Sequence, residues 1–229
     1  MEYSITKQEY ERIRTLLYDE SGISLGDTKQ SLVVSRLTKR LRDLQMEDFS
    51  SYYEYVTRDE SGEEFTRMLD LLSTNKTDFF REPKHFDFLR ERILPTLEQE
   101  KRIRIWSSAC STGEEPYTIA MTLHEAVKNP ALWNFQILAS DISTRVLAHA
   151  AKGLYAEERV REVPADIVKR HFLQGRGDSA GLVKVKPHLS AIIKFRRMNL
   201  MDDRFPIKAP LDLIFCRNVM IYFDRPTQE

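Results

Sequence analysis

Residues 102–117 read RIRIWSSACSTGEEPY, and this stretch decides the fold class. Its first five residues alternate charged and apolar side chains, which predicts a short strand. A loop with a single glycine follows, and a helix is expected from Tyr117 to about Lys128. A second strand over 135–141 completes a βαβ unit, the building block of parallel sheets, and another helix is expected over 144–152.

Two later segments extend this α/β prediction. The run LDLIFC at 211–216 suits a strand buried on both faces, which is typical of parallel sheets. Between 175 and about 197, three glycines and the alternating run LVKVK at 182–186 predict a small antiparallel insertion. We therefore expect an α/β domain over 73–229, with a β insertion at about 173–198.

The N-terminal third carries helix signals and no strand signal. Thr6 and Glu9 have the spacing of a capping box, and apolar residues follow at helical spacing. Further helices are expected near 29–45, 48–57 and 60–72. This predicts an all-α domain over 1–72, joined to the α/β domain near 70–78 without a proline- or glycine-rich spacer.

Composition excludes several classes of protein. The chain has 229 residues, 41% of them hydrophobic and 31% charged, with a formal net charge of zero, so a nucleic-acid-binding protein is not expected. Cys110 and Cys216 form no CxxC motif and the five histidines form no close pair, so no metal site is expected. The N-terminus lacks the features of a signal peptide and no apolar run is long enough to span a membrane. We expect a cytoplasmic monomer without direct membrane insertion.

Two acidic positions predict the kind of ligand. Ligands of such sheets bind beyond the carboxyl ends of the strands. The loop before Tyr117 has one glycine and two carboxylates, which suits a cationic group better than a pyrophosphate. Asp141 ends the second strand, where a carboxylate can accept hydrogen bonds from ribose hydroxyls. An adenosine ligand with a positive amino-acid end, such as S-adenosylmethionine (SAM), fits both.

Plainer interpretations of these positions stay open. Acidic residues at a helix N-terminus are favoured by the helix dipole without any ligand. Asp141 or Ser143 is a suitable N-cap for the next helix.

Four segments carry a resemblance to a known family. They are STNKTDFFRE at 73–82, RIWSSACSTGEEPY at 104–117, ASDI at 139–142 and IFCRNVMIYF at 214–223. In this order and spacing they resemble the motifs of the CheR family of chemotaxis receptor methyltransferases, and the similarity covers essentially the whole chain. The resemblance implies a Rossmann-like SAM-dependent methyltransferase sheet with the small β insertion, preceded by the all-α domain.

The resemblance also implies an activity, a cofactor and site residues. The activity is transfer of a methyl group from SAM to glutamate side-chain carboxylates of chemoreceptors, which forms methyl esters in chemotaxis adaptation and leaves S-adenosylhomocysteine. Arg81 and Tyr222 would orient the acceptor. The implied cofactor-binding residues are Asn75, Thr77, Arg81, Glu115, Asp141, Asn199, Leu200, Arg217 and Asn218. As alternatives, Asn75 and Thr77 are suitable helix caps, Arg81 is placed to pair with Glu82 or Asp78, and Asn199 suits a turn.

Two further segments concern the receptor. The second helix is basic, and Arg36, Lys39 and Arg40 share one face; the family's equivalent helix is thought to meet the receptor's acidic methylation helices. The loop with Gly175, Gly177 and Gly181 resembles the longer loop of family members that bind a C-terminal receptor pentapeptide. A solvated helix face and a flexible hairpin are the alternatives.

The expected mechanism is an in-line displacement that needs no general base, because a glutamate with pKa about 4.3 is ionised near neutrality. The chain stops at Glu229, whereas the family's domain normally continues through a helix and further strands. A truncated, non-catalytic module that binds receptor and SAM is therefore one alternative. A methyltransferase with another acceptor is the second.

Overall fold

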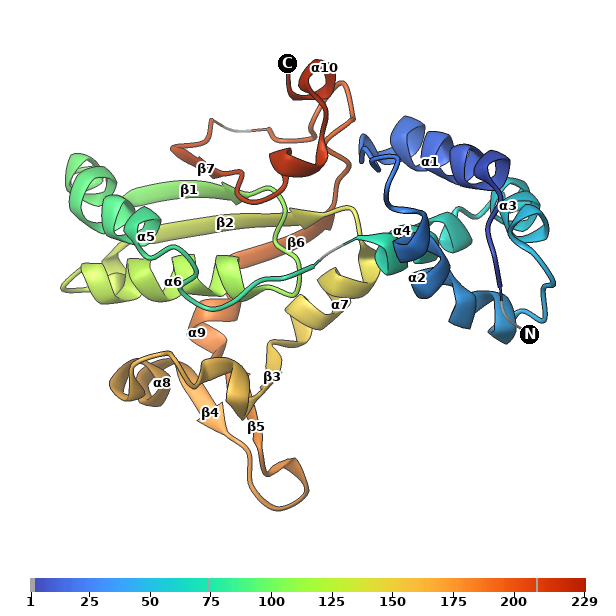
Figure 1. The fold of residues 1–229 in the computed structure, drawn as a ribbon. Helices are drawn as coiled ribbons and strands as arrows, with labels where there is room; N and C mark the ends of the chain where they lie inside the picture. The colour runs from blue at the N-terminus through green and yellow to red at the C-terminus, as the bar shows by residue number, and fades with distance from the viewer. Residues whose placement is uncertain (1–2, 74, 209) are drawn as a thin grey trace. The chain divides into compact units, whose positions relative to one another are not determined.

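The structure is a computed structural model that describes residues 3–73, 75–208 and 210–229. The described residues divide into two compact units (Figure 1). A helical unit contains residues 3–73, 199–203 and 218–229, and an α/β unit contains residues 75–198, 204–208 and 210–217. In these described parts of the chain, no helix is both long and apolar enough to cross a membrane.

The helical unit begins as its sequence predicts. The side-chain oxygen of Thr6 accepts the N–H of Glu9, whose carboxylate accepts the N–H of Thr6, so the expected capping box is confirmed. The apolar faces of the helices bury residues such as Tyr10, Leu37 and Tyr52. The elements of this unit are α1 (Lys7–Ser21), α2 (Gln30–Asp43), α3 (Phe49–Arg58), α4 (Glu63–Leu72), the 3₁₀ helix η6 (Met220–Tyr222) and α10 (Arg225–Gln228).

The α/β unit is built on a parallel sheet of four strands in the order β6-β2-β1-β7 (Figure 1). In its centre, Ile105 of β1 pairs with Ile137 of β2 on one side and with Leu213 of β7 on the other. The expected α/β class is therefore confirmed. The strands are β1 (Arg102–Ser107), β2 (Asn134–Asp141), β6 (Ile193–Arg197) and β7 (Leu213–Phe215).

Helix α6 starts earlier than the sequence predicts. It spans Glu114–Ala126 rather than beginning at Tyr117. Pro116 lies in its first turn, where a helix N–H has no intrahelical partner and a proline is tolerated. The other helices of the sheet layers are α5 (Lys84–Phe88), the π-helical turn η1 (Leu89–Ile93), the 3₁₀ helices η2 (Leu94–Leu97) and η3 (Pro130–Leu132), and α7 (Thr144–Lys152).

The small antiparallel sheet is present, but its bounds differ from those expected. It has the order β3-β5-β4, and its first strand already begins at Leu154. Conversely, β6 falls within the expected insertion yet pairs with β2 of the main sheet. Figure 1 shows α9 between the two sheets. The elements are β3 (Leu154–Ala156), β4 (Phe172–Gln174), β5 (Leu182–Val185), the 3₁₀ helices η4 (Glu157–Val160) and η5 (Gly177–Ser179), α8 (Ala165–His171) and α9 (Pro187–Ser190).

Strand β7 is less buried than its sequence predicts. Phe215 is buried and stacks on Phe86 with ring centroids 5.7 Å apart, but the neighbouring Ile214 is 51% exposed. β7 ends the strand order and pairs only with β1 among the described strands. Its apolar composition therefore does not correspond to burial on both faces.

Candidate functional site

The strand order places a candidate ligand site at the carboxyl end of β1. The chain continues from β1 to β2 on one side of the sheet, while β7 pairs with β1 on the other side. Connections therefore diverge between β1 and β7, and parallel sheets bind ligands at such a switch point.

The loop from β1 to α6 is fixed to the ends of both neighbouring strands. Ser108 donates its N–H to the carbonyl of Phe215 at 2.9 Å, and Cys110 donates its N–H to the carbonyl of Ser140 at 2.8 Å. Gly113 closes the loop with φ of 99°, and a Cβ at this position would lie 2.8 Å from that of Ala150. Only glycine therefore fits this turn without displacing helix α7.

Asp141, at the end of β2, organises the same loop. Its Oδ2 accepts the N–H of Ser111 at 2.9 Å and its Oδ1 accepts the N–H of Ser143 at 3.0 Å. The N-cap of α7 is Ser143, whose hydroxyl accepts the N–H of Val146. The sequence allows either Asp141 or Ser143 as the N-cap of α7, and in the structure Ser143 is the N-cap. Asp141 instead accepts a hydrogen bond from the loop before α6.

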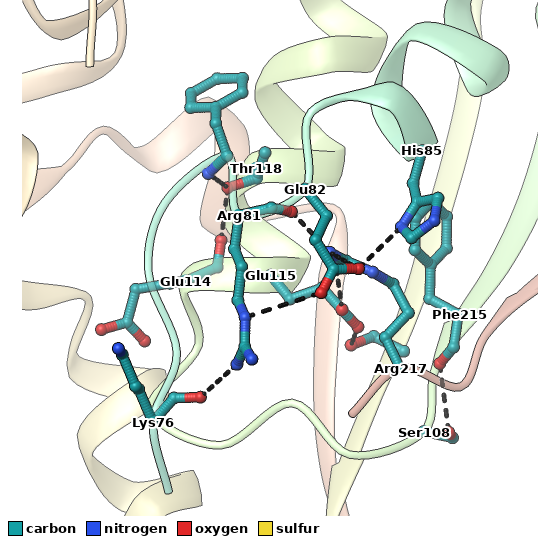
Figure 2. Close-up of polar contacts among 12 residues, drawn as sticks. Lys76, Arg81, Glu82, His85, Ser108, Glu114, Glu115, Thr118, Phe215 and Arg217 are labelled. Atoms are coloured by element: carbon teal, nitrogen blue, oxygen red, sulfur yellow. Dashed lines mark hydrogen bonds and ion pairs between the residues drawn. The ribbon is translucent and has the colours of Figure 1, made fainter. Parts of the chain in front are cut away.

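Glu115, in the first turn of α6, is a buried carboxylate with two donors. It accepts the hydroxyl of Ser107 at 2.7 Å. It also accepts Nη1 of Arg217 at 3.0 Å (Figure 2). Burial raises the pKa of Glu115, and the hydrogen bond from Ser107 and the charge of Arg217 offset part of that increase. The pair is 10–11% exposed, so it joins the end of β7 to α6 in a nearly dry environment.

Arg217 also holds the segment that precedes α5. Its Nη2 donates to the carbonyl of Arg81 and to the carboxylate of Glu82 at 3.2 Å (Figure 2). The guanidinium lies over the ring of Phe86, 5.2 Å from the centroid. Arg217 therefore binds one carboxylate in each of two segments: Glu82, before α5, and Glu115, in α6.

The segment 75–82 makes a compact turn against this loop. Nη1 of Arg81 donates to the carbonyl of Lys76 at 2.7 Å, and the N–H of Phe80 donates to the hydroxyl of Thr118 at 3.1 Å (Figure 2). Phe80 has a positive φ of 56°, a conformation that a bulky residue adopts only where contacts hold it. Thr74, which belongs to the same sequence motif, lies outside the described residues.

The ion pair between Glu114 and Arg159 was missing from the sequence-based prediction. The carboxylate of Glu114 is only 1% exposed and accepts Nη2 of Arg159 and the hydroxyl of Thr112, both at 2.6 Å. Arg159 also bonds to Asp78 through Nη1 at 3.0 Å. A buried glutamate requires a cation or several hydrogen-bond donors. The sequence does not say which of the many arginines provides that cation for Glu114.

The predicted cofactor-binding residues and the predicted acceptor residue Tyr222 are distributed over both units. Asn75, Thr77, Arg81, Glu115, Asp141 and Arg217 belong to the α/β unit, and the structure brings their segments together around the loop before α6. Asn199, Leu200, Asn218 and Tyr222 belong to the helical unit. There, Nδ2 of Asn199 donates to the carbonyl of Glu20 at 2.7 Å, and the carbonyl of Tyr222 accepts the N–H of Ser24 at 2.9 Å.

The basic face of α2 is partly engaged within the helical unit. Nη1 of Arg36 donates to the carbonyls of Leu72 and Ser73, both at 2.7 Å, at the end of α4. Arg40 forms a bidentate ion pair with the buried Glu64 of α4. Lys39, between them in sequence, is exposed.

The three glycines of the predicted receptor loop lie between β4 and β5. Gly175 donates its N–H to the carbonyl of Leu182 at 2.8 Å, and an added Cβ would come within 2.0 Å of the carbonyl of Ser179. Gly177 and Gly181 have φ of 57° and 80°. The glycines therefore shape the connection that ends the two strands.

The carboxylates at the strand ends fit SAM. Two carboxylates lie at the carboxyl ends of the strands: Glu115, in the first turn of α6 after β1, and Asp141, the last residue of β2. The loop from β1 to α6 has a single glycine. Carboxylates repel a pyrophosphate and attract an ammonium or sulfonium group. Glu115 accepts two hydrogen bonds of the roughly four that a carboxylate can accept, so it retains capacity for a ligand.

Sequence comparison identifies the family of the chain. The family model described as "CheR methyltransferase, SAM binding domain" matches residues 75–229, and the one described as "CheR methyltransferase, all-alpha domain" matches residues 8–73. Chemotaxis protein methyltransferase 2 of Pseudomonas aeruginosa is 44% identical over 229 residues, covering 99% of this chain and 80% of that protein. The chemotaxis protein methyltransferases of Borreliella burgdorferi and Salmonella typhimurium are 41% and 39% identical, with 98% and 99% of this chain and 81% and 77% of those proteins covered.

Fold, site and matches together define a SAM-dependent methyltransferase. More particularly, the chain belongs to the CheR family of chemotaxis protein methyltransferases, as its four motifs predict. A chemotaxis methyltransferase implies a chemoreceptor as its substrate.

Proposed function

We propose that this enzyme methylates glutamate side chains in the methylation helices of a chemoreceptor. The observation that carries the proposal is the joint position of Glu115, Asp141 and the turn at 75–81 around one loop at the carboxyl end of β1. In a switch-point site of a SAM-dependent methyltransferase, this is where the cofactor binds. The all-α domain would extend over 1–72 and the catalytic domain over 73–229.

Nine residues are proposed to bind the cofactor. Glu115 would accept the ammonium of the methionine end and Asp141 the ribose hydroxyls. Asn199 and Leu200 would lie beside the adenine. The remaining members are Asn75, Thr77, Arg81, Arg217 and Asn218. When bound, SAM supplies a methyl group on a positively charged sulfur.

The acceptor needs orientation rather than activation. A glutamate carboxylate with an ordinary pKa of about 4.3 is ionised near neutrality, so the protein has no proton to remove. Arg81 and Tyr222 are the proposed orienting residues, and Arg81 is held in place by its own hydrogen bond to Lys76 and by Arg217. Orientation of this kind contributes roughly 7–11 kcal/mol in the best cases.

Two surfaces are proposed to bind the receptor. The basic face of α2 (Arg36, Lys39 and Arg40) would steer the acidic methylation helices by charge complementarity. The loop at Gly175, Gly177 and Gly181 would serve a C-terminal receptor pentapeptide, because β3 and β4 are the outer strands of the small sheet and an extended peptide can add to such an edge. The enzyme is proposed to act as a monomer in the cytoplasm.

The test is to incubate the chain with methyl-labelled SAM and a receptor cytoplasmic fragment, and to treat the product with alkali. Methyl esters are released by alkali and N-methyl groups are not, so base-labile label on the receptor supports the proposal. Label that resists alkali would contradict it. If there is no label, calorimetric binding of S-adenosylhomocysteine separates a binding module from a chain that does not form the site.

A further inference from the structure

The segment that carries Arg81 depends on a side chain from a distant part of the sequence. Nη2 of Arg159, in η4, donates to the carbonyl of Thr77 and to Oε1 of Glu114, while Nη1 donates to Asp78. We refer to Arg159, Glu114, Thr77 and Asp78 as the Arg159 cluster. It connects the small-sheet insertion, the N-terminus of α6 and the turn at 75–81.

The geometry of the Arg159 cluster is that of a support for the turn. Glu114 is 1% exposed and both its oxygens are occupied, by Arg159 and by Thr112. A planar guanidinium has five N–H donors in fixed directions, so one arginine can bind a carbonyl and two carboxylates at once. A lysine at the same position would be a point charge without this fixed arrangement.

Neighbouring contacts fix the same turn from the same insertion. The ring of Phe79 packs edge-on against Tyr155 of β3, with centroids 5.1 Å apart, and the hydroxyl of Tyr155 donates to the carbonyl of Thr112 at 2.8 Å. Phe80 and Glu82, on either side of Arg81, both have φ of 56°. Such a conformation persists only where the surroundings hold it.

We propose that Arg159 is a positioning residue that holds the Arg81 turn against the start of α6 in the geometry that binds SAM. The inference rests on the proposed cofactor site. Arg159 acts through Thr77 and Asp78 and is not assigned any contact with the reacting atoms. Loss of the guanidinium would remove this support of the turn, and small displacements of positioning groups can cost up to about a hundredfold in rate.

The experiment compares three variants of the full chain with the wild type. Arg159→Ala is expected to raise the Kd for S-adenosylhomocysteine, measured by calorimetry, at least about tenfold. In the methylation assay it should raise the KM for SAM and leave the KM for the receptor fragment nearly unchanged. Arg170→Ala is the matched control, because Arg170 also joins the insertion to α6, through the exposed end of Glu125.

A double variant separates positioning from stability. Arg159→Ala alone leaves the buried Glu114 charged and without its cation, which lowers the Tm. Adding Glu114→Gln removes that charge and should restore much of the Tm, while S-adenosylhomocysteine binding stays weak because Thr77 and Asp78 still lack their donor.

Each outcome decides the proposal. The role of Arg159 would be overturned if the double variant bound S-adenosylhomocysteine with wild-type affinity, or if Arg170→Ala and Arg159→Ala lost affinity equally. In both cases, binding of S-adenosylhomocysteine by the wild-type chain would leave the proposed cofactor site intact. If the wild-type chain itself binds no S-adenosylhomocysteine, the proposed site is wrong and this inference with it.

Discussion

Arg217 donates from Nη1 to Oε2 of Glu115 at 3.0 Å. Arg217 lies two residues after the end of β7 and Glu115 lies in the first turn of α6, so the contact joins these two segments. Both side chains are about nine-tenths buried, at 10% and 11% exposure. The same guanidinium binds the carbonyl of Arg81. Three of the segments that carry the family's motifs thus meet at one ion pair.

Removal of Arg217 should therefore destabilise the α/β unit. Arg217→Ala leaves the buried Glu115 without its cation, and we expect a loss of about 3–5 kcal/mol in the free energy of unfolding, measured by urea denaturation. Adding Glu115→Gln should recover part of it. Arg90→Ala is the control, because Arg90 also makes two ion pairs but on the surface, and should cost less than about 1 kcal/mol. Equal losses at the two arginines would contradict this prediction.

Arg81 should matter for turnover rather than for folding. Its side chain is one-third exposed and its guanidinium makes one short hydrogen bond, to the carbonyl of Lys76, so Arg81→Ala should cost less than about 1 kcal/mol of stability. We expect turnover of the receptor fragment to fall at least about a hundredfold, because the proposed acceptor loses an orienting group. A variant with wild-type turnover would remove Arg81 from the site.

Two residues of the basic helix α2 should behave differently. Arg40 pairs with Glu64, which is 6% exposed and also accepts the hydroxyl of Tyr52 at 3.0 Å. Arg40→Ala should therefore lower the unfolding free energy of the helical unit by about 3 kcal/mol. Lys39→Glu, on the exposed side, should leave stability within about 0.5 kcal/mol and raise the KM for the receptor, more so at low salt. An unchanged KM in Lys39→Glu would argue against the proposed receptor face.

Stability should fall at acidic pH because of three histidines where α8 and α9 meet α6. His171 contacts His188 at 3.0 Å and Glu125 at 2.7 Å, and the ring of His124 lies 5.0 Å from that of His188. Burial lowers the pKa of His124 to about 4, and it also lowers the pKa values of His171 and His188. The charged groups beside these rings are Glu125, Arg170 and Lys186, and Arg170 also pairs with Asp166.

The sign follows from the proton balance. Between about pH 6.5 and 4 the unfolded chain binds protons that these three rings in the folded chain do not, so the unfolding free energy decreases as pH falls through this range. The pKa of Glu125 is lowered: burial raises it, but hydrogen bonds from Arg170 and His171 outweigh burial. Its contribution is therefore lost in the same direction. His124→Phe should flatten the dependence of the urea midpoint on pH, and His149→Gln, at an exposed position, should not. A wild-type midpoint equal at about pH 7 and pH 5 would contradict this.

The sequence by itself determined the layout of the chain. The capping box at Thr6, the strand at 102–106 and the helix at 144–152 are local signals, because period and capping depend on neighbouring residues. The prediction that the motif loop and Asp141 bind a ligand also rests on local signals, because a glycine and carboxylates between a strand and a helix point to a ligand site wherever the strand lies in the sheet.

Tertiary structure decided the pairings, which depend on residues far apart in the chain. Nothing local in β6 distinguishes a strand of the insertion from one that pairs with β2, and nothing local in β7 shows that Ile214 is exposed. Likewise, Glu114 and Arg159 are 45 positions apart in the chain, and the sequence carries no sign that the two side chains meet. Burial and ion pairing are properties of the assembled core, so the partner of a buried charge is fixed only when the chain has folded.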